Sequence, residues 1–431
     1  MFKTIANAWK LADLRSKILY VLFIVFLYHI GSAIPVPFVN SGMLGQFAEY
    51  TDGSILQYLS ILSGNAFSQA TLFALGISPY ITASIVVQLL SIAIPYLEKK
   101  SKEGEEGKKW LNQFTRVITV VLGVITAFGY FKLLDSNGVF AYNGVPTWFA
   151  GIIIVSCYCA GSALVMWLAE KINENGIGNG ISIILFVNIV SSTPSMIASL
   201  WSSYLASGDW VKCIIGIAVI LVTIASIFFI VFITDSERRL PVQYAKKVVG
   251  RKMYGGQSST LPLKLNMTGV MPLIFANSIV TLPSTIGMFL SDGSSVKKFL
   301  NNWFGVDTWV YAILTFVLII AFAYFYVTIS FNPVEVANNL KKNGGFIPGI
   351  RPGKPTSDYI TKVLNRITLI GALFLDIIAI LPIVANIISG SQLSALAFTG
   401  SSVIIIVGVV LETAREIESQ MTMRHYKGFL E

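Results

Sequence analysis

Charged side chains are scarce in this sequence. Asp, Glu, Lys and Arg make up 12% of the 431 residues, whereas soluble domains carry about 25%. That scarcity excludes a surface that faces water on all sides. Apolar side chains take their place: 54% of the residues are hydrophobic, and the mean hydropathy is +0.71. The composition therefore predicts an all-α polytopic membrane protein.

Residues with catalytic or metal-binding chemistry are also few. The chain has three cysteines and two histidines. Cys157 and Cys159 are two positions apart on an expected helix and point in different directions, which argues against a disulfide or a metal site. No Walker loop, HExxH or GxSxG motif is present. The glycines of 176–180 lack a preceding strand and a following Lys-Ser/Thr, so they predict a turn that starts a helix. We expect no enzyme, cofactor or metal.

Long apolar runs are abundant, and a membrane span needs about 20 such residues. Ten runs are candidates, at 18–35, 71–95, 115–134, 148–169, 180–200, 211–233, 267–289, 309–330, 366–388 and 393–411. With ten spans, 27 of the 31 Lys and Arg residues fall on the side that holds both termini. Because positive charge collects on the cytoplasmic side, both termini are predicted to be cytoplasmic. The net charge of +9 then reflects orientation and needs no nucleic acid.

The ten spans divide into five and five, which predicts an N-terminal half at 1–205 and a C-terminal half at 206–431. A repeat with an odd number of spans must be inverted in the membrane. Inverted repeats place the functional pathway between the halves, near the midplane.

Residues 55–70 have helical spacing, with Ile55, Leu59 and Leu62 on one stripe and polar residues elsewhere. The segment is too short to span the membrane and too polar to face lipid. Irregular backbone at membrane depth requires surrounding protein or water. The residues leave two interpretations open: a re-entrant helix that dips in from outside, or an amphipathic helix on the membrane surface.

Two long basic loops, 234–266 and 331–365, are predicted on the cytoplasmic side. In the first loop, the alternation of Val, Tyr and Lys together with a Gly-Gly pair predicts a protruding hairpin. A Gly pair and two Pro-Gly steps in the second predict a shaped loop. Either loop could be a solvated surface or a binding surface. The run from Glu98 to Lys109 has mixed charges without such turns and is predicted to be a solvated loop.

Ionisable residues are nearly absent from the midplane, where transporters usually carry them. His29 is predicted to be a packing or interfacial residue, and Asp376 to hydrogen-bond a neighbouring helix. A secondary transporter is the alternative, but it predicts paired midplane charges. Any pathway would therefore be narrowest at apolar residues, which can gate by dewetting. Six aliphatic residues near helix breaks are candidates, although each taken singly is better explained by ordinary packing: Ile77, Ile81, Ile181, Leu185, Ile274 and Ile405.

Five motifs, in order along nearly the whole chain, resemble the SecY family, the channel subunits of the bacterial general protein translocase. They are Phe73–Ile81 with Ser84–Leu90, Gly176–Ser182, Tyr244–Lys247, Leu261–Asn266, and Gly345–Gly353.

The resemblance implies an hourglass pore between two inverted halves, with residues 55–70 as a plug. The six aliphatic residues match the pore-ring positions, and Leu185 replaces the commoner Ile. Plug residues would be Ser60, Leu62, Ser63, Gly64, Asn65 and Phe67. Lateral-gate residues would be Ser84, Gln88, Asn277 and Leu282. Residues that dock partners would be Arg238, Arg239, Lys246, Lys247, Arg251 and Arg351.

The resemblance also implies a function. The channel would pass unfolded secretory polypeptides across the bacterial cytoplasmic membrane and release apolar segments sideways into lipid. Implied partners are SecE, SecG, SecA, the ribosome, a preprotein with a signal sequence, and membrane lipid, with no nucleic acid except ribosomal RNA at the loops. A specialised accessory channel is a further possibility, but the intact loop motifs favour the housekeeping form.

Overall fold

The computed structural model describes residues 8–40, 42–45, 55–142, 144–206, 210–244, 247–249, 252–254, 258–288, 290, 294–305, 308–389 and 399–427. Each predicted span overlaps a helix in this part of the chain. The helices are α2 (Ala12–Ala33), α5 (Ser78–Ala93), α7 (Glu105–Ser136), α8 (Thr147–Asn175), α9 (Gly180–Leu200), α10 (Trp210–Asp235), α11 (Met271–Met288), α13 (Trp309–Ser330), α15 (Lys354–Ile388) and α16 (Thr399–Lys427).

By length and composition, seven helices in the described residues can cross a membrane. An eighth span results if α5 and α6 (Pro95–Ser101), which are bent by 106° at a short break, are counted together. Helix α11 is apolar but only 18 residues long, and α16 becomes charged from Glu412 onward. The protein is therefore a multi-pass membrane protein, as predicted, while the count of ten spans stays a prediction.

The second predicted span differs from the observed helix, because α5 begins only at Ser78. Residues 71–77 form turns, with Gly76 in the left-handed region at φ +54° and Pro79 in the first turn of α5. Phe73 and Ala74 are 4% and 2% exposed. This irregular backbone is buried in protein. Non-helical backbone is tolerated at membrane depth only where protein or a water-filled cavity surrounds it.

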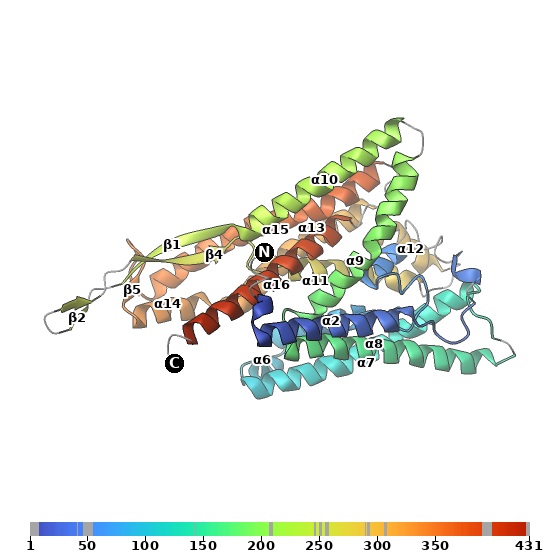
Figure 1. The fold of residues 1–431 in the computed structure, drawn as a ribbon, viewed down its shortest axis with the longest axis horizontal. Helices are drawn as coiled ribbons and strands as arrows, with labels where there is room; N and C mark the ends of the chain where they lie inside the picture. The colour runs from blue at the N-terminus through green and yellow to red at the C-terminus, as the bar shows by residue number, and fades with distance from the viewer. Residues whose placement is uncertain are drawn as a thin grey trace.

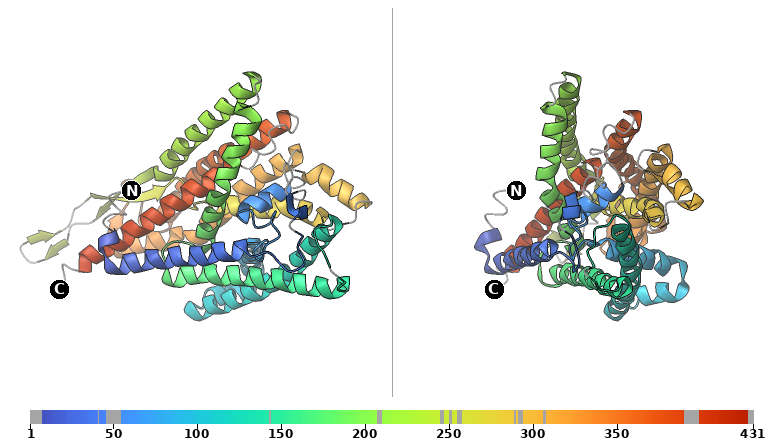
Figure 2. Two further views of the ribbon diagram at one scale, coloured as in Figure 1. Left: turned by 45° about the vertical axis from the view of Figure 1, so that its right-hand side comes forward. Right: turned by 90° about the vertical axis from the view of Figure 1, so that its right-hand side faces the viewer.

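The long helices pack as two bundles that meet along two seams (Figures 1 and 2). One bundle contains α2, α5, α7, α8 and α9, and the other contains α10, α11, α13, α15 and α16. At the α9–α16 seam, α9 packs against α16, and the π-helical turn η1 (Trp201–Leu205) leads into α10. At the α5–α11 seam, α11 packs against α5 and α7.

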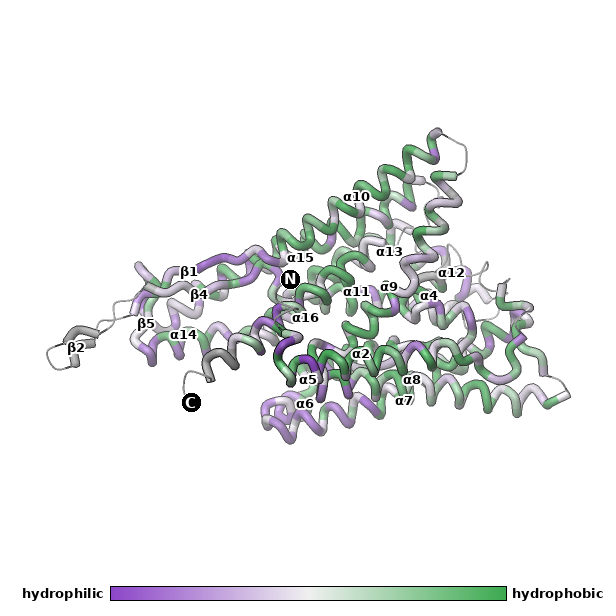
Figure 3. Tube along the Cα trace, viewed as in Figure 1, coloured by the Kyte–Doolittle hydropathy of each residue, from purple (hydrophilic) through white to green (hydrophobic). Residues whose placement is uncertain are grey.

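The two predicted basic loops form one structure at one end of the molecule, here called the loop end (Figure 1). Strand β1 (Glu237–Tyr244) pairs antiparallel with β4 (Ser258–Lys264), and β2 (Lys247–Val249) pairs with β3 (Lys252–Tyr254) beyond them. Strand β5 (Gly345–Phe346), which follows α14 (Pro333–Lys342), adds to the free edge of β1. Figure 3 shows this end as predominantly hydrophilic, in contrast to the apolar helices. The predicted hairpin is confirmed, and the second loop is joined to it.

The run from Glu98 to Lys109 was predicted to be a loop, and that prediction is wrong. Most of it is helical, in α6 and the start of α7. Ion pairs at helical spacing support these turns, with 2.6 Å between Lys102 Nζ and Glu98 Oε1. Mixed charges three and four residues apart stabilise a helix as readily as they solvate a loop.

The glycines of 176–180 form the predicted turn before a helix. The Asn179 side chain caps α9 by accepting hydrogen bonds from the backbone N–H groups of Ile181 and Ser182.

Candidate functional site

The six aliphatic candidates come from four helix regions and lie in one hydrophobic cluster. Ile81 belongs to α5 and Ile77 precedes it, while the others come from α9, α11 and α16. Five of the six are no more than 4% exposed, and Ile181 is half-buried. Side chains this inaccessible leave no water-filled passage at their level, so the structure is closed here. Their role as a pore ring stays a prediction.

Helix α4 (Ile55–Leu62) covers this cluster from the end opposite the loop end, here called the far end. Ile61 and Leu62 belong to the same hydrophobic cluster as the six aliphatic residues. Leu56 and Ser63 are 2% and 3% exposed. The segment is therefore embedded in protein, and the interpretation as a helix lying on the membrane surface is wrong.

Residues 63–70 turn back after α4 through a left-handed pair. Gly64 and Asn65 have φ +65° and +68°, and the Asn65 N–H donates to the Ser60 carbonyl at 2.8 Å. The Ser63 hydroxyl accepts from the Phe67 N–H at 3.0 Å. Local polar groups thus satisfy the backbone of this break, and the predicted plug residues form one compact unit.

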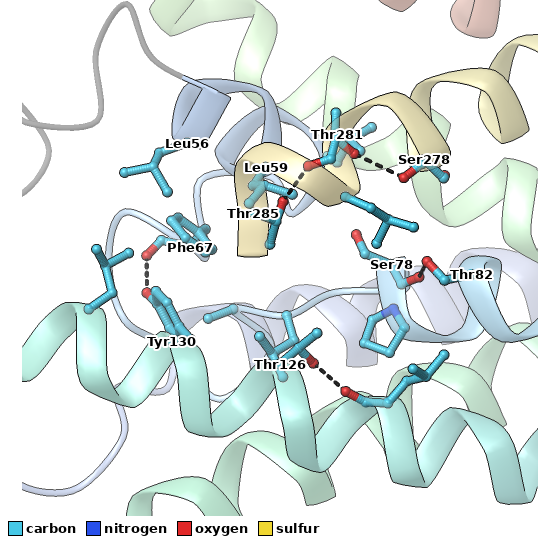
Figure 4. Close-up of a pocket in the computed structure, with 17 residues that line it drawn as sticks. Leu56, Leu59, Phe67, Ser78, Thr82, Thr126, Tyr130, Ser278, Thr281 and Thr285 are labelled. Atoms are coloured by element: carbon cyan, nitrogen blue, oxygen red, sulfur yellow. Dashed lines mark hydrogen bonds between the residues drawn. The ribbon is translucent and has the colours of Figure 1, made fainter. Parts of the chain in front are cut away.

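Two residues outside the predicted set hold this unit in place. Asn188 of α9 is fully buried, and its Nδ2 donates to the Leu62 carbonyl at 2.6 Å. Tyr130 of α7 donates to the Phe67 carbonyl (Figure 4). Sequence reasoning missed both. Both are polar side chains within apolar runs of the sequence. Such groups require hydrogen-bond partners in the membrane, so this pattern could have identified them.

A cavity of about 120 Å³ lies at the α5–α11 seam, between α4, α5, α7 and α11 (Figure 4). Several threonine hydroxyls in its walls donate to carbonyls of their own helices, for example Thr82 to the Ser78 carbonyl at 3.1 Å and Thr285 to the Thr281 carbonyl at 2.8 Å. Leu282, a predicted gate residue, lines the cavity. The walls are therefore predominantly apolar.

The other predicted gate residues lie closer to the loop end. Gln88 donates to the Ser84 hydroxyl at 3.3 Å and accepts from the Tyr326 hydroxyl of α13 at 3.2 Å. Tyr326, which sequence reasoning missed, therefore joins the two bundles. Asn277 is 3% exposed, and its Nδ2 has no partner in the described part of the chain.

The docking residues are only partly described. Arg238 and Arg239 lie exposed on β1, where Arg239 Nε is 2.6 Å from Glu237 Oε1. Arg351 is exposed in the second loop. Lys247 begins β2, but only its backbone is described, and Lys246 and Arg251 fall outside the described residues.

A charged cluster at the roots of the first loop was not predicted. Arg415 of α16 donates to the Thr234 carbonyl at 2.5 Å and to Asp235 Oδ1 at 2.6 Å, at the C-terminus of α10. One turn earlier, Glu412 lies against Gly269, where a Cβ would come within 1.8 Å of Oε1, just before α11 begins. The Arg415 cation lies at the partly negative C-terminal end of α10, and the Glu412 carboxylate lies near the partly positive N-terminal end of α11. Each charge is therefore stabilised by the dipole of the helix that it faces. The C-terminus of α10 is thus hydrogen-bonded to α16, and the backbone just before α11 packs closely against α16.

Lys264 lines a cavity of about 210 Å³ beside these residues. Burial and then the Arg415 guanidinium lower the pKa of the Lys264 ammonium.

The prediction that Asp376 hydrogen-bonds a neighbouring helix is wrong. Its side chain is 1% exposed, and neither carboxylate oxygen has a partner in the described residues. His29 is exposed and packs edge-on against Tyr28, with ring centroids 5.9 Å apart. Across the described ranges, no group of His, Cys, Asp and Glu could hold a metal ion.

The fold and these features define a helical membrane channel that is closed in this structure. Solved structures share the fold: one described as a protein conducting channel has a TM-score of 0.66 at 18% identity, with 94% of this chain and 92% of that chain covered. Another, of a SecY protein whose plug domain is described as stabilising the closed state, has a TM-score of 0.65 at 19% identity, with 94% of this chain and 92% of that chain covered.

The SecY family model matches residues 71–414. The chain is 42% identical to a protein translocase subunit SecY from Streptomyces galbus and 41% identical to one from Mycobacterium bovis, and each alignment covers 100% of both chains. This chain belongs to the SecY family, so the resemblance seen in the sequence is confirmed. The names of these relatives describe a translocase subunit and agree with the prediction of a protein that is not an enzyme.

Proposed function

We propose that this chain is the protein-conducting channel of the bacterial cytoplasmic membrane, which passes unfolded secretory polypeptides. The observation that carries the proposal is the convergence of six aliphatic side chains from α5, α9, α11 and α16 in one cluster. A polypeptide of any sequence cannot be guided by specific hydrogen bonds. A constriction of flexible aliphatic side chains can fit around varied residues while resisting ion flow by dewetting.

In this proposal, the segment 55–70 is the plug. It seals the cluster through Ile61 and Leu62 and must leave when a polypeptide enters. Its polar residues are compatible with that movement, because Ser60, Ser63 and Asn65 can exchange their internal hydrogen bonds for bonds to water. The contacts to Asn188 and Tyr130 then set how readily the plug is displaced.

The α5–α11 seam is the proposed lateral gate. A sufficiently apolar segment would leave the pore through it, since each Leu or Ile at the membrane centre contributes about −0.3 to −0.6 kcal/mol to insertion. The apolar cavity beside α11 and the Gln88–Tyr326 contact lie along this path.

Energy and direction would come from partners, because no nucleotide-binding motif is recognisable in the sequence. The exposed arginines of the loop end are the proposed docking site for SecA or for ribosomal RNA, with SecE and SecG as membrane partners. Solved relatives of this fold include Sec61 in a canine ribosome–channel complex. Both termini, together with the loop end, would then be cytoplasmic, and the inverted halves would be 1–205 and 206–431.

Reconstitution tests the function directly. Vesicles that contain this chain with SecE should protect a signal-bearing preprotein from protease when SecA and ATP are added. Absence of a protected product, with SecA and SecE shown to be active, would contradict the proposal.

A disulfide tests the plug. A Cβ built on Gly76 lies 3.6 Å from Ser63 Cβ, which is within the range for disulfides. In a background without the native cysteines, the pair Ser63→Cys and Gly76→Cys should form a bond that fixes the plug. Transport should fall at least about tenfold and return on reduction, as is expected if plug displacement is obligatory. Each single variant serves as the control, and full transport by the oxidised pair would rule out a moving plug.

A further inference from the structure

Helix α12 (Ser295–Phe304) is a ten-residue amphipathic helix at the far end of the molecule, between α11 and α13 (Figures 1 and 2). Val296, Phe299 and Trp303 are 55%, 53% and 53% exposed. Their spacing of three and four residues places them on one face of the helix. Lys298 is exposed and falls on the other side of the helix, and the exposed Asn302 lies between Lys298 and Phe299 around the helix. Three large apolar side chains exposed on one face of a helix indicate a surface that contacts lipid or another protein.

Other tryptophans show the level at which α12 lies. Tryptophans collect where a membrane meets water. Of the eight in the chain, four others are exposed at helix ends at the far end, in the first two residues of α8, α10 and α13 and directly after α9: Trp148, Trp210, Trp309 and Trp201. Trp303 adds a fifth at this end. Helix α12 thus lies at the level of an aromatic belt.

Two side-chain hydroxyls hold the C-terminal end of the helix by donating hydrogen bonds to its backbone carbonyls. Ser284 of α11 is 3% exposed, and its hydroxyl donates to the Phe304 carbonyl at 2.6 Å. Thr308, before α13, donates to the Trp303 carbonyl at 3.0 Å. Leu300 and Phe304 are half-buried. The exposed apolar face is therefore held in a fixed orientation and does not turn inward.

We infer that α12 binds the bilayer surface on the far side, with Val296, Phe299 and Trp303 inserted at the boundary of headgroups and acyl chains and Lys298 facing anionic headgroups. Apolar residues on one face and lysine on the other are the chemistry of interfacial helices. A protein partner fits less well, because a stable protein interface buries about 800 Å² on each side, more than three side chains offer. Through Ser284, this contact anchors the far end of α11, which lines the cavity at the α5–α11 seam.

Spin labelling of the full-length chain in vesicles tests the insertion. With the native cysteines replaced, labels are attached at Phe299→Cys and, as the matched control on the polar face, at Lys298→Cys. The label at 299 should be accessible to oxygen and shielded from a water-soluble nickel reagent, and the label at 298 should show the reverse. Equal exposure of both labels to the nickel reagent would overturn the inference. Exclusion of both reagents from 299 would also overturn it, because that pattern indicates a protein cover.

Lipid selectivity tests the charged part. A fluorophore at position 299 should be quenched more by brominated phosphatidylglycerol than by brominated phosphatidylcholine at equal content. Lys298→Gln should reduce this preference by up to about fivefold. A fluorophore at Ile125, exposed on α7, is the control and should show no preference. Equal quenching by both lipids at 299 would refute the role of Lys298. These outcomes rest only on the membrane position of the chain, so they are independent of whether it conducts polypeptides.

Discussion

The two seams between the bundles are packed differently. At the α9–α16 seam, backbone approaches closely: a Cβ on Gly178, whose φ is +86°, would lie 3.0 Å from Ile183 Cδ1 and 3.3 Å from Thr413 Oγ1 of α16. The α5–α11 seam instead contains a cavity of about 120 Å³ and a hydrogen bond between Gln88 and Tyr326 at 3.2 Å. Separating two close-packed helices breaks many van der Waals contacts. Residues that line a cavity already lack some of these contacts, so their separation costs less. The α5–α11 seam therefore offers less resistance to separation than the α9–α16 seam, as its proposed role as a lateral gate requires.

The largest effect is expected at the close-packed seam. Gly178→Ala should reduce the free energy of unfolding by about 2–4 kcal/mol, because it combines left-handed backbone strain with crowding against Ile183 and Thr413. The measurement is unfolding of the detergent-solubilised protein followed by circular dichroism. Gly138→Ala is the matched control, since Gly138 has φ +66° and open space around its Cβ position. Equal losses in both variants would show that the seam adds no packing constraint.

An intermediate effect is expected where α16 holds the root of the first loop. Arg415→Met should cost about 1–2 kcal/mol, since it removes charged hydrogen bonds to the Thr234 carbonyl and to Asp235. Hydrogen exchange should accelerate in residues 230–240. Lys171→Met, which removes only the exposed pair of Lys171 with Glu174, should change little. Unchanged exchange near the loop root would argue against this anchor.

The smallest effect is expected at the loosely packed seam. Tyr326→Phe removes one hydrogen bond between helices, worth about 0.6 kcal/mol in a membrane. If this seam is the lateral gate, membrane insertion of a marginally apolar segment should rise about threefold relative to its full translocation. Tyr324→Phe is the matched control, because Tyr324 donates to the Asn365 carbonyl within one bundle. An equal rise in both variants would remove Tyr326 from the gate.

The helices and their order were predictable because lipid as a solvent imposes a minimum apolar length on each span. The hairpin of β1 and β4 was predictable from alternation and turn residues. Local structure at two boundaries was not. The start of α5 depends on the buried turns at 71–77, and the helical run at 98–109 depends on ion pairs that a loop of the same composition could also carry.

Of the site, sequence reasoning found the aliphatic residues but not the polar side chains that hydrogen-bond residues 55–70 and join the two bundles at the α5–α11 seam. Asn188 and the Leu62 carbonyl are 126 positions apart, and Tyr326 and Gln88 are 238 apart. Periodicity shows which face of a helix is apolar but not which helix it meets.

Composition and apolar length were enough to predict that the chain resides in a membrane, and the charge distribution predicts that its basic loops and both termini share one side. Only the tertiary structure decided that the two basic loops form one sheet, that residues 55–70 are embedded over the aliphatic cluster, and that one seam is close-packed while the other holds a cavity. The reason is that lipid tails are as apolar as leucine, so hydrophobicity drives each span into the membrane without selecting its neighbours. That selection comes from glycine contacts and single buried hydrogen bonds between residues far apart in the chain.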